Sequence, residues 1–115
     1  MIYLTRSALV YAANICEELP RYRVRIAVPS MDAVNNIVSI IGMNIEDDKA
    51  DFRISKTNSS ILFSNGSYID IFVGNGNSRG KKAHLLIVDK TIDEEFVSCV
   101  LRPMEAWDYY KTSIS

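Results

Sequence analysis

Apolar residues recur at helical spacing in two stretches of the first 45 residues. Thr5 can cap the first helix through its hydroxyl, and Pro20 ends it. Pro29 and Ser30 predict a turn that leads into the second helix. The inward faces are predicted to be Leu9, Ala12, Ala13, Cys16 and Leu19 in the first helix, and Val34, Ile37, Val38 and Ile41 in the second.

Two apolar stretches have the pattern of strands rather than helices. Residues 23–28 alternate, with Val24, Ile26 and Val28 on one side. Residues 83–88 are almost continuously apolar, which predicts a parallel strand covered on both faces. Between the two stretches, Gly42 and the acidic residues 46–48 predict a solvated loop.

A β-hairpin is predicted over residues 60–64 and 67–73, which flank Asn65 and Gly66. An Asn-Gly pair suits a two-residue type I′ loop, because both central residues need positive φ values. In that geometry Phe63 lies opposite Tyr68, and Leu62 lies opposite Ile69.

The last third repeats the order of strand and helix. Residues 91–94 read as a capping box that opens a helix closed by Pro103. Phe96, Val97, Val100 and Leu101 are expected to face inward. We therefore expect one α/β domain over residues 1–104 and a C-terminal tail, residues 105–115.

Composition excludes several classes of protein. The formal charge of -1 gives no global attraction to nucleic acid or to an anionic membrane. Cys16 and Cys99 lie far apart, which favours two buried thiols over a disulfide or a zinc site. No apolar run approaches the ~18 residues of a membrane span, so a cytoplasmic protein is expected. His84, the only histidine, is expected to have a hydrogen-bonded structural role.

Asp89 follows the apolar residues 85–88 and is the strongest candidate for chemistry. A carboxylate at the end of a buried parallel strand lies where α/β proteins bind ligands, and P-loop NTPases bring an acid to nucleotide-bound magnesium in this way. Alternatively, Asp89 can cap or orient the turn before Thr91. The 115 residues contain no G-x-x-x-x-G-K-[ST] phosphate loop, and Lys90 stands where such enzymes commonly carry a catalytic acid.

The order of these parts resembles the ATPase domain of bacteriophage terminase large subunits, the motors that pump DNA into phage capsids. The matching segments, over residues 5–104, are a helix, IAVPS, a second helix, NGS at a hairpin turn, SRG, AHLLIVD and a helix leading to LRP. The resemblance implies a partial P-loop-NTPase-like sheet with flanking helices and an inserted β-hairpin. Thr5, Arg6 and Ser7 would align with the end of the phosphate loop, and Asp89 would be a vestigial magnesium and nucleotide position. The segment IAVPSMDAVNNIV is also similar to a strand and helix of DNA helicases.

Two groups of cations are candidates for contact with DNA phosphates. Arg79, Lys81 and Lys82 lie in a Gly-containing loop between two strands, which lacks the spacing and the following helix of a phosphate loop. A flexible connection is therefore preferred to a phosphate site there. The second group is Arg21, Arg23 and Arg25, although charges that alternate along a strand are usually a solvated face.

These observations predict a degenerate or truncated terminase-like module that binds or regulates rather than catalyses, with no catalytic residue and no metal site. Magnesium and ATP would bind only if another chain completed the site in trans, and DNA binding is the other alternative. A protein partner or self-association is expected, because the family's strand before Thr5 lies inside its sheet and its loss would expose an edge. A membrane partner is not expected.

Overall fold

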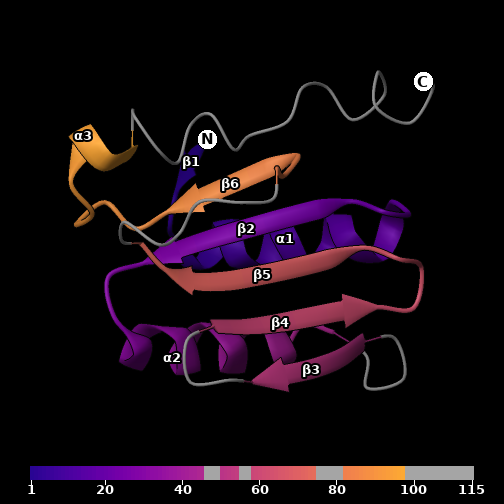
Figure 1. The fold of residues 1–115 in the computed structure, drawn as a ribbon. Coiled ribbons are helices and arrows are strands. Elements are labelled where there is room, and N and C mark those ends of the chain that lie inside the picture. Colours follow the sequence, from indigo (N-terminus) through magenta and orange to yellow (C-terminus); the bar gives the residue numbers. More distant parts are fainter. Residues whose placement is uncertain (46–49, 55–57, 75–81, 98–115) are drawn as a thin grey trace.

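A computed structural model of the chain describes residues 1–45, 50–54, 58–74 and 82–97. The fold is a mixed α/β structure in which one six-stranded sheet is covered by two long helices on one face (Figure 1). The helices are α1 Arg6–Glu18, α2 Met31–Gly42 and the short α3 Glu94–Phe96. The strands are β1 Ile2–Tyr3, β2 Arg23–Val28, β3 Ala50–Ile54, β4 Asn58–Phe63, β5 Tyr68–Val73 and β6 Leu85–Val88.

The sheet has the order β1-β6-β2-β5-β4-β3. The first four strands in this order run parallel to one another, whereas β4 is antiparallel to both β5 and β3. A mixed sheet results, in which a hairpin and one further strand extend a parallel core.

The main core lies between the helices and the sheet. It includes Leu9, Ala12 and Cys16 of α1, Val34 and Ile41 of α2, and inward residues of four strands such as Val24, Ile61, Ile69 and Ile87. The predicted apolar faces of both helices are confirmed, and Thr5 caps α1 by accepting a hydrogen bond from the Ala8 N–H at 3.0 Å.

A second, smaller cluster lies on the other face of the sheet. It joins Ala27, Phe72, Leu86, Val88 and Val97, with Ile92 packed against it. Because β6 contributes residues to both clusters, the prediction of a parallel strand covered on both faces is confirmed. Ile92 and Val97, which follow β6, therefore pack on the opposite face from α1 and α2.

The hairpin is present, but its predicted register is wrong by one residue. Leu62 lies opposite Tyr68, and Ile61 lies opposite Ile69. The loop has three residues, because the Phe63 N–H donates to the Ser67 carbonyl at 2.8 Å and Gly66 alone in the loop has a positive φ, 90°. The loop matches the three-residue form with glycine in the left-handed region, not a type I′ turn.

The reason for this loop is a tertiary contact of Asn65. Its amide Nδ2 donates to the Cys16 carbonyl at 2.8 Å, and its Oδ1 accepts from the Ser67 N–H at 3.0 Å. Asn65 therefore satisfies a carbonyl at the end of α1 while it shapes its own turn.

The structure corrects one further prediction and adds two strands. The capping box is wrong: Asp93 caps α3 by accepting from the Glu95 N–H, while the Thr91 hydroxyl donates to Asp89. Strands β1 and β3 were not predicted; β1 pairs with β6, and β3 pairs with β4. The predictions for residues 46–48, Val100, Leu101, Pro103 and the tail fall outside the described residues, as does the side chain of Phe96.

No helix in the described part of the chain has the length and apolar character needed to cross a membrane.

Candidate functional site

Asp89 lies at the carboxyl end of β6, between β1 and β2. The Leu4 N–H donates to the Val88 carbonyl at 2.8 Å, and the Asp89 N–H donates to the Ala27 carbonyl at 3.0 Å. These hydrogen bonds continue the two parallel ladders to the last residue of β6 and fix Asp89 at the sheet edge where β1 and β2 also end.

The N-termini of both long helices lie at this same edge. Thr5, the N-cap of α1, comes two residues after β1, and Ser30, the N-cap of α2, comes two residues after β2. The chain leaves β1 and β2 toward one face of the sheet and leaves β6 toward the other. Such a reversal between neighbouring parallel strands is the position at which open α/β sheets bind ligands.

The Asp89 carboxylate is engaged within its own turn. Its Oδ1 accepts hydrogen bonds from the Thr91 N–H at 2.9 Å and from the Thr91 hydroxyl at 2.7 Å. The sequence left two roles open for Asp89, metal binding and orientation of the following turn. These hydrogen bonds show the second role. Lys90 is exposed beside it.

A metal site would need more than this one carboxylate. Magnesium in nucleotide sites takes one or two carboxylates together with substrate phosphates and waters. Among residues 1–45, 50–54, 58–74 and 82–97, no three His, Cys, Asp or Glu side chains are grouped so that they could hold a metal ion. Asp89 could therefore hold a metal only with ligands from beyond these described residues, such as nucleotide phosphates or another chain.

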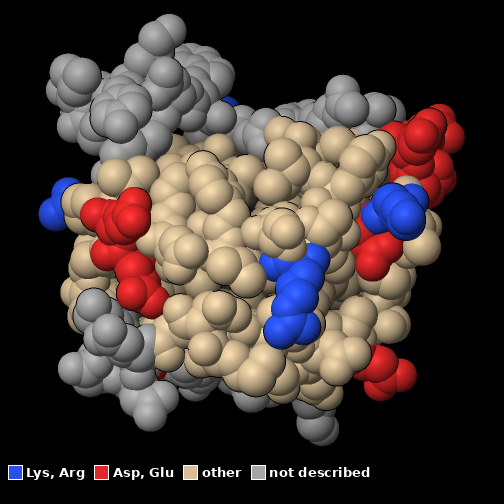
Figure 2. Space-filling view, turned by 180° about the vertical axis from the view of Figure 1, so that it is seen from behind, with Lys and Arg blue, Asp and Glu red and all other residues tan. Residues whose placement is uncertain are grey.

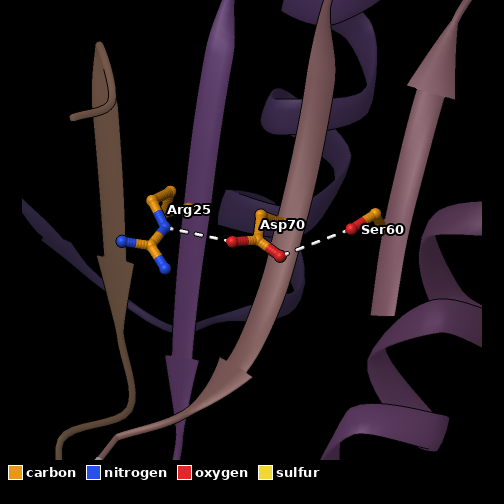
Figure 3. A network of polar contacts seen from close by, with 3 residues as sticks. All are labelled: Arg25, Ser60 and Asp70. Atoms are coloured by element: carbon orange, nitrogen blue, oxygen red, sulfur yellow. Dashed lines mark hydrogen bonds and ion pairs between the residues drawn. The ribbon is translucent and has the colours of Figure 1, made fainter. Parts of the chain in front are cut away.

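Arg25 forms an ion pair that the sequence did not reveal. Its Nε donates to Asp70 Oδ2 at 3.1 Å, and the hydroxyl of Ser60 donates to Asp70 Oδ1 at 3.4 Å (Figure 3). The three residues lie side by side on β2, β5 and β4, on the sheet face opposite the long helices. The side chains of Arg25 and Asp70 are 8% and 17% exposed, and the guanidinium carbon lies 4.2 Å from the centroid of the Phe72 ring.

This ion pair separates Arg25 from the other candidate cations. Arg21 and Arg23 are exposed, whereas Arg25 is 7% exposed. A buried cation that pairs with Asp70 and stacks over a ring is already engaged by the protein, so it presents little charge to a nucleic acid. The signal that could have found the pair is Asp70 itself, an acid within the apolar strand YIDIFV, at a position that alternates with Ile69 and Ile71.

The other described candidate cations lie at the opposite end of the sheet from Asp89. Arg23 begins β2, and Lys82 precedes β6 and is exposed. The His84 N–H donates to the Arg23 carbonyl at 2.8 Å, which joins the amino ends of these two strands. Arg79 and Lys81 fall outside the described residues. The structure therefore does not bring Arg23 or Lys82 close to the candidate nucleotide position at Asp89.

His84 has the structural role that the sequence predicts. Its Nδ1 accepts a hydrogen bond from the Arg23 N–H at 3.1 Å, and its ring stacks on Tyr22 with centroids 5.2 Å apart. Burial lowers the pKa of His84, and the positive charge of Arg23 lowers this pKa further. Protonation at Nδ1 would remove the acceptor, so the geometry and the electrostatics both favour the neutral ring.

We therefore expect the protein to lose stability as the pH falls from about 6.5 through the lowered pKa of His84. In that window the unfolded chain binds a proton that the folded chain does not bind. Thermal melts between pH 8 and pH 5 should show the loss, and H84N, whose Oδ1 can accept the same hydrogen bond, should reduce it. An identical pH profile for H84N would assign the loss to other groups.

Cys16 is a buried thiol, as predicted. Its Sγ donates to the Tyr68 carbonyl at 3.8 Å, and burial raises the pKa of Cys16 to about 12. A thiol with this pKa is a poor nucleophile and a poor metal ligand at neutral pH. Cys99 falls outside the described residues.

No family model, curated protein or solved structure matches this chain significantly.

Proposed function

We propose that this chain is a module similar to the ATPase domain of phage terminase large subunits, and that it binds or regulates in DNA packaging rather than hydrolysing nucleotide. The observation that carries the proposal is the position of Asp89 at the carboxyl edge of the sheet, next to a strand that runs directly into the N-terminus of α1. P-loop NTPases require this neighbourhood, because the nucleotide phosphates lie at a helix N-terminus and the magnesium lies beside a strand-end acid. The order of the segments IAVPS, NGS, SRG and AHLLIVD along the sequence is consistent with this proposal.

The residues around Asp89 favour a role without catalysis. Lys90 places a cation where a catalytic acid would follow Asp89, and Thr91 already donates two hydrogen bonds to the carboxylate. Phosphoryl transfer depends almost entirely on the positioning of the phosphates and of the attacking water. Among the described residues, no three His, Cys, Asp or Glu side chains are grouped at this edge so that they could hold a metal ion.

A half-site completed in trans is the second candidate. The N-termini of α1 and α2 lie at the same edge as Asp89, so nucleotide phosphates held by a phosphate loop from another chain would meet two helix dipoles of favourable sign there. MgATP would then bind only in the joint site, with Asp89 as one magnesium ligand. A DNA-binding module has less support, because Arg25 is buried against Asp70.

One titration distinguishes these functions. The chain, with and without D89N, is added to an intact terminase large subunit from the same genome, and MgATP hydrolysis and binding heat are measured. We expect no hydrolysis and no heat from the chain alone, because Asp89 alone cannot hold magnesium and a triphosphate. The terminase rate should change when the chain is added, and D89N should leave that change intact.

Other outcomes are equally informative. A change in rate that D89N abolishes would favour the trans half-site. Micromolar binding of MgATP by the chain alone, dependent on Asp89, would contradict a role without nucleotide. The proposal also fails if the terminase rate is unchanged and no complex forms.

A further inference from the structure

The charges on α1 oppose its helix dipole. Arg6 lies in the first turn and Glu17 and Glu18 lie in the last, and the helix has no acid in its first turn and no base in its last. Cations are unfavourable near the positive N-terminal end of a helix, and anions are unfavourable near the negative C-terminal end. Within the described part of the chain, no ion pair of these three side chains compensates for this placement.

The surface between these charges is poor in charge. Seen from the side of the long helices, most of the described surface is uncharged, with one group of basic atoms near its middle and the other charged residues toward its margins (Figure 2). The exposed residues after Arg6 on α1 and after Asp32 on α2 are polar or apolar without charge, apart from Glu18: Ser7, Tyr11, Asn14, Asn35, Asn36 and Ser39, with Met43 following α2. Tyr11 is 51% exposed and Met43 is 70% exposed. Depletion of charge together with exposed Tyr and Met is typical of a protein interface, and Tyr11 lies beside the line from Arg6 to Glu17 on the helix surface rather than on it.

The charges of α1 are complementary to those of a second copy of α1 that runs antiparallel to it. Arg6, Val10 and Glu17 follow one another by four and seven residues, which places them along one stripe of the helix. Arg6 and Glu17 are eleven residues apart, or about 16 Å along the axis. In two antiparallel copies of α1, Arg6 of each copy therefore lies next to Glu17 of the other, and Val10 and Asn14 lie near the middle.

We propose that α1 packs antiparallel on α1 of a second copy along the stripe of Arg6, Val10 and Glu17, so that reciprocal ion pairs between Arg6 and Glu17 hold a homodimer whose contact is bordered by the charge-poor surface of α1. The pairing is isologous, so a two-fold axis closes it at two copies. It also places each Arg6 beside the negative C-terminal end of the other helix, so the arrangement that is unfavourable in the monomer becomes favourable in the dimer. A second copy is the occupant that this pattern specifies, because any other partner would need the same charges in the same reversed order. The proposal does not depend on the function proposed above.

Charge reversal tests the interface. Sedimentation velocity over a concentration series should show a dimer for the parent chain, and at least a tenfold weaker dimer for both R6E and E17R. An equimolar mixture of R6E and E17R should restore dimerisation, because the heterodimer regains opposite charges at both contacts. R6E puts an acid in the first turn of α1 and E17R puts a base in its last turn, and the helix dipole favours both placements. The monomers of both variants should therefore have melting temperatures no lower than that of the parent.

R23E is the matched control. It makes the same change of charge at an exposed residue whose side chain alternates with the inward Val24 and therefore points to the sheet face opposite α1. R23E should leave the dimer unchanged. A parent that is monomeric at high concentration, a dimer that both reversals leave intact, a mixture that stays monomeric, or equal weakening by R23E would each overturn the proposal.

Discussion

Replacing Asp70 with alanine is expected to lower the free energy of unfolding by about 3–5 kcal/mol, because it removes one member of a buried ion pair. Asp70 accepts from Arg25 Nε at 3.1 Å and from the Ser60 hydroxyl, and its side chain is 17% exposed. Without the carboxylate, a guanidinium that is largely withdrawn from water keeps its charge and loses this partner. Chemical denaturation with a two-state fit measures the change.

Two control variants distinguish the effect of breaking the ion pair from the effect of losing side-chain volume. The double variant R25M with D70L replaces both charges by apolar groups of similar size, and it should recover most of the stability that D70A loses. D32A deletes an exposed carboxylate in the first turn of α2 and should cost no more than about 1 kcal/mol. A loss for D70A as small as that for D32A would show that the pair is effectively solvated.

The elements with strong periodicity could be predicted from the sequence. Both long helices and β2 and β6 were found because their apolar residues repeat over several turns or alternate without interruption. Strand β1 has two residues, and its pairing with β6 joins positions more than eighty residues apart. A strand of this length carries no pattern of its own, so only the folded sheet reveals it.

In the candidate site, too, one feature could be predicted from a local pattern and another could not. The position of Asp89 at a strand end follows from a local run of apolar residues, and it was predicted. The Arg25–Asp70 pair depends on the parallel register of β2 with β5, in which these two residues are partners. The two residues are 45 positions apart in the sequence, so no local pattern contains this register. For this reason the sequence pattern placed Arg25 in one group with Arg21 and Arg23, although Arg25 is buried.

The hairpin error has a related cause. Asn65 and Gly66 suit a type I′ loop locally, but the Asn65 side chain bonds instead to the end of α1, and the loop takes a third residue. The NGS segment is one of the segments on which the proposed terminase resemblance rests. In this protein it has a structural role. Asn65 joins the hairpin to α1, Gly66 takes the positive φ, and Ser67 bridges the connection between α1 and β2.

Replacing Ser67 with alanine is accordingly expected to lower the free energy of unfolding by about 1–3 kcal/mol. The Ser67 hydroxyl is buried, accepts from the Tyr22 N–H at 2.9 Å and donates to the Leu19 carbonyl. Alanine keeps the shape of the turn and removes both hydrogen bonds, so the cost reports the desolvated backbone groups at the start of β2. S64A is the matched control, because Ser64 is exposed in the same loop, and it should change stability by less than about 0.5 kcal/mol. Equal denaturation midpoints for S67A and S64A would mean that the hairpin and the end of α1 are joined by Asn65 without help from the serine.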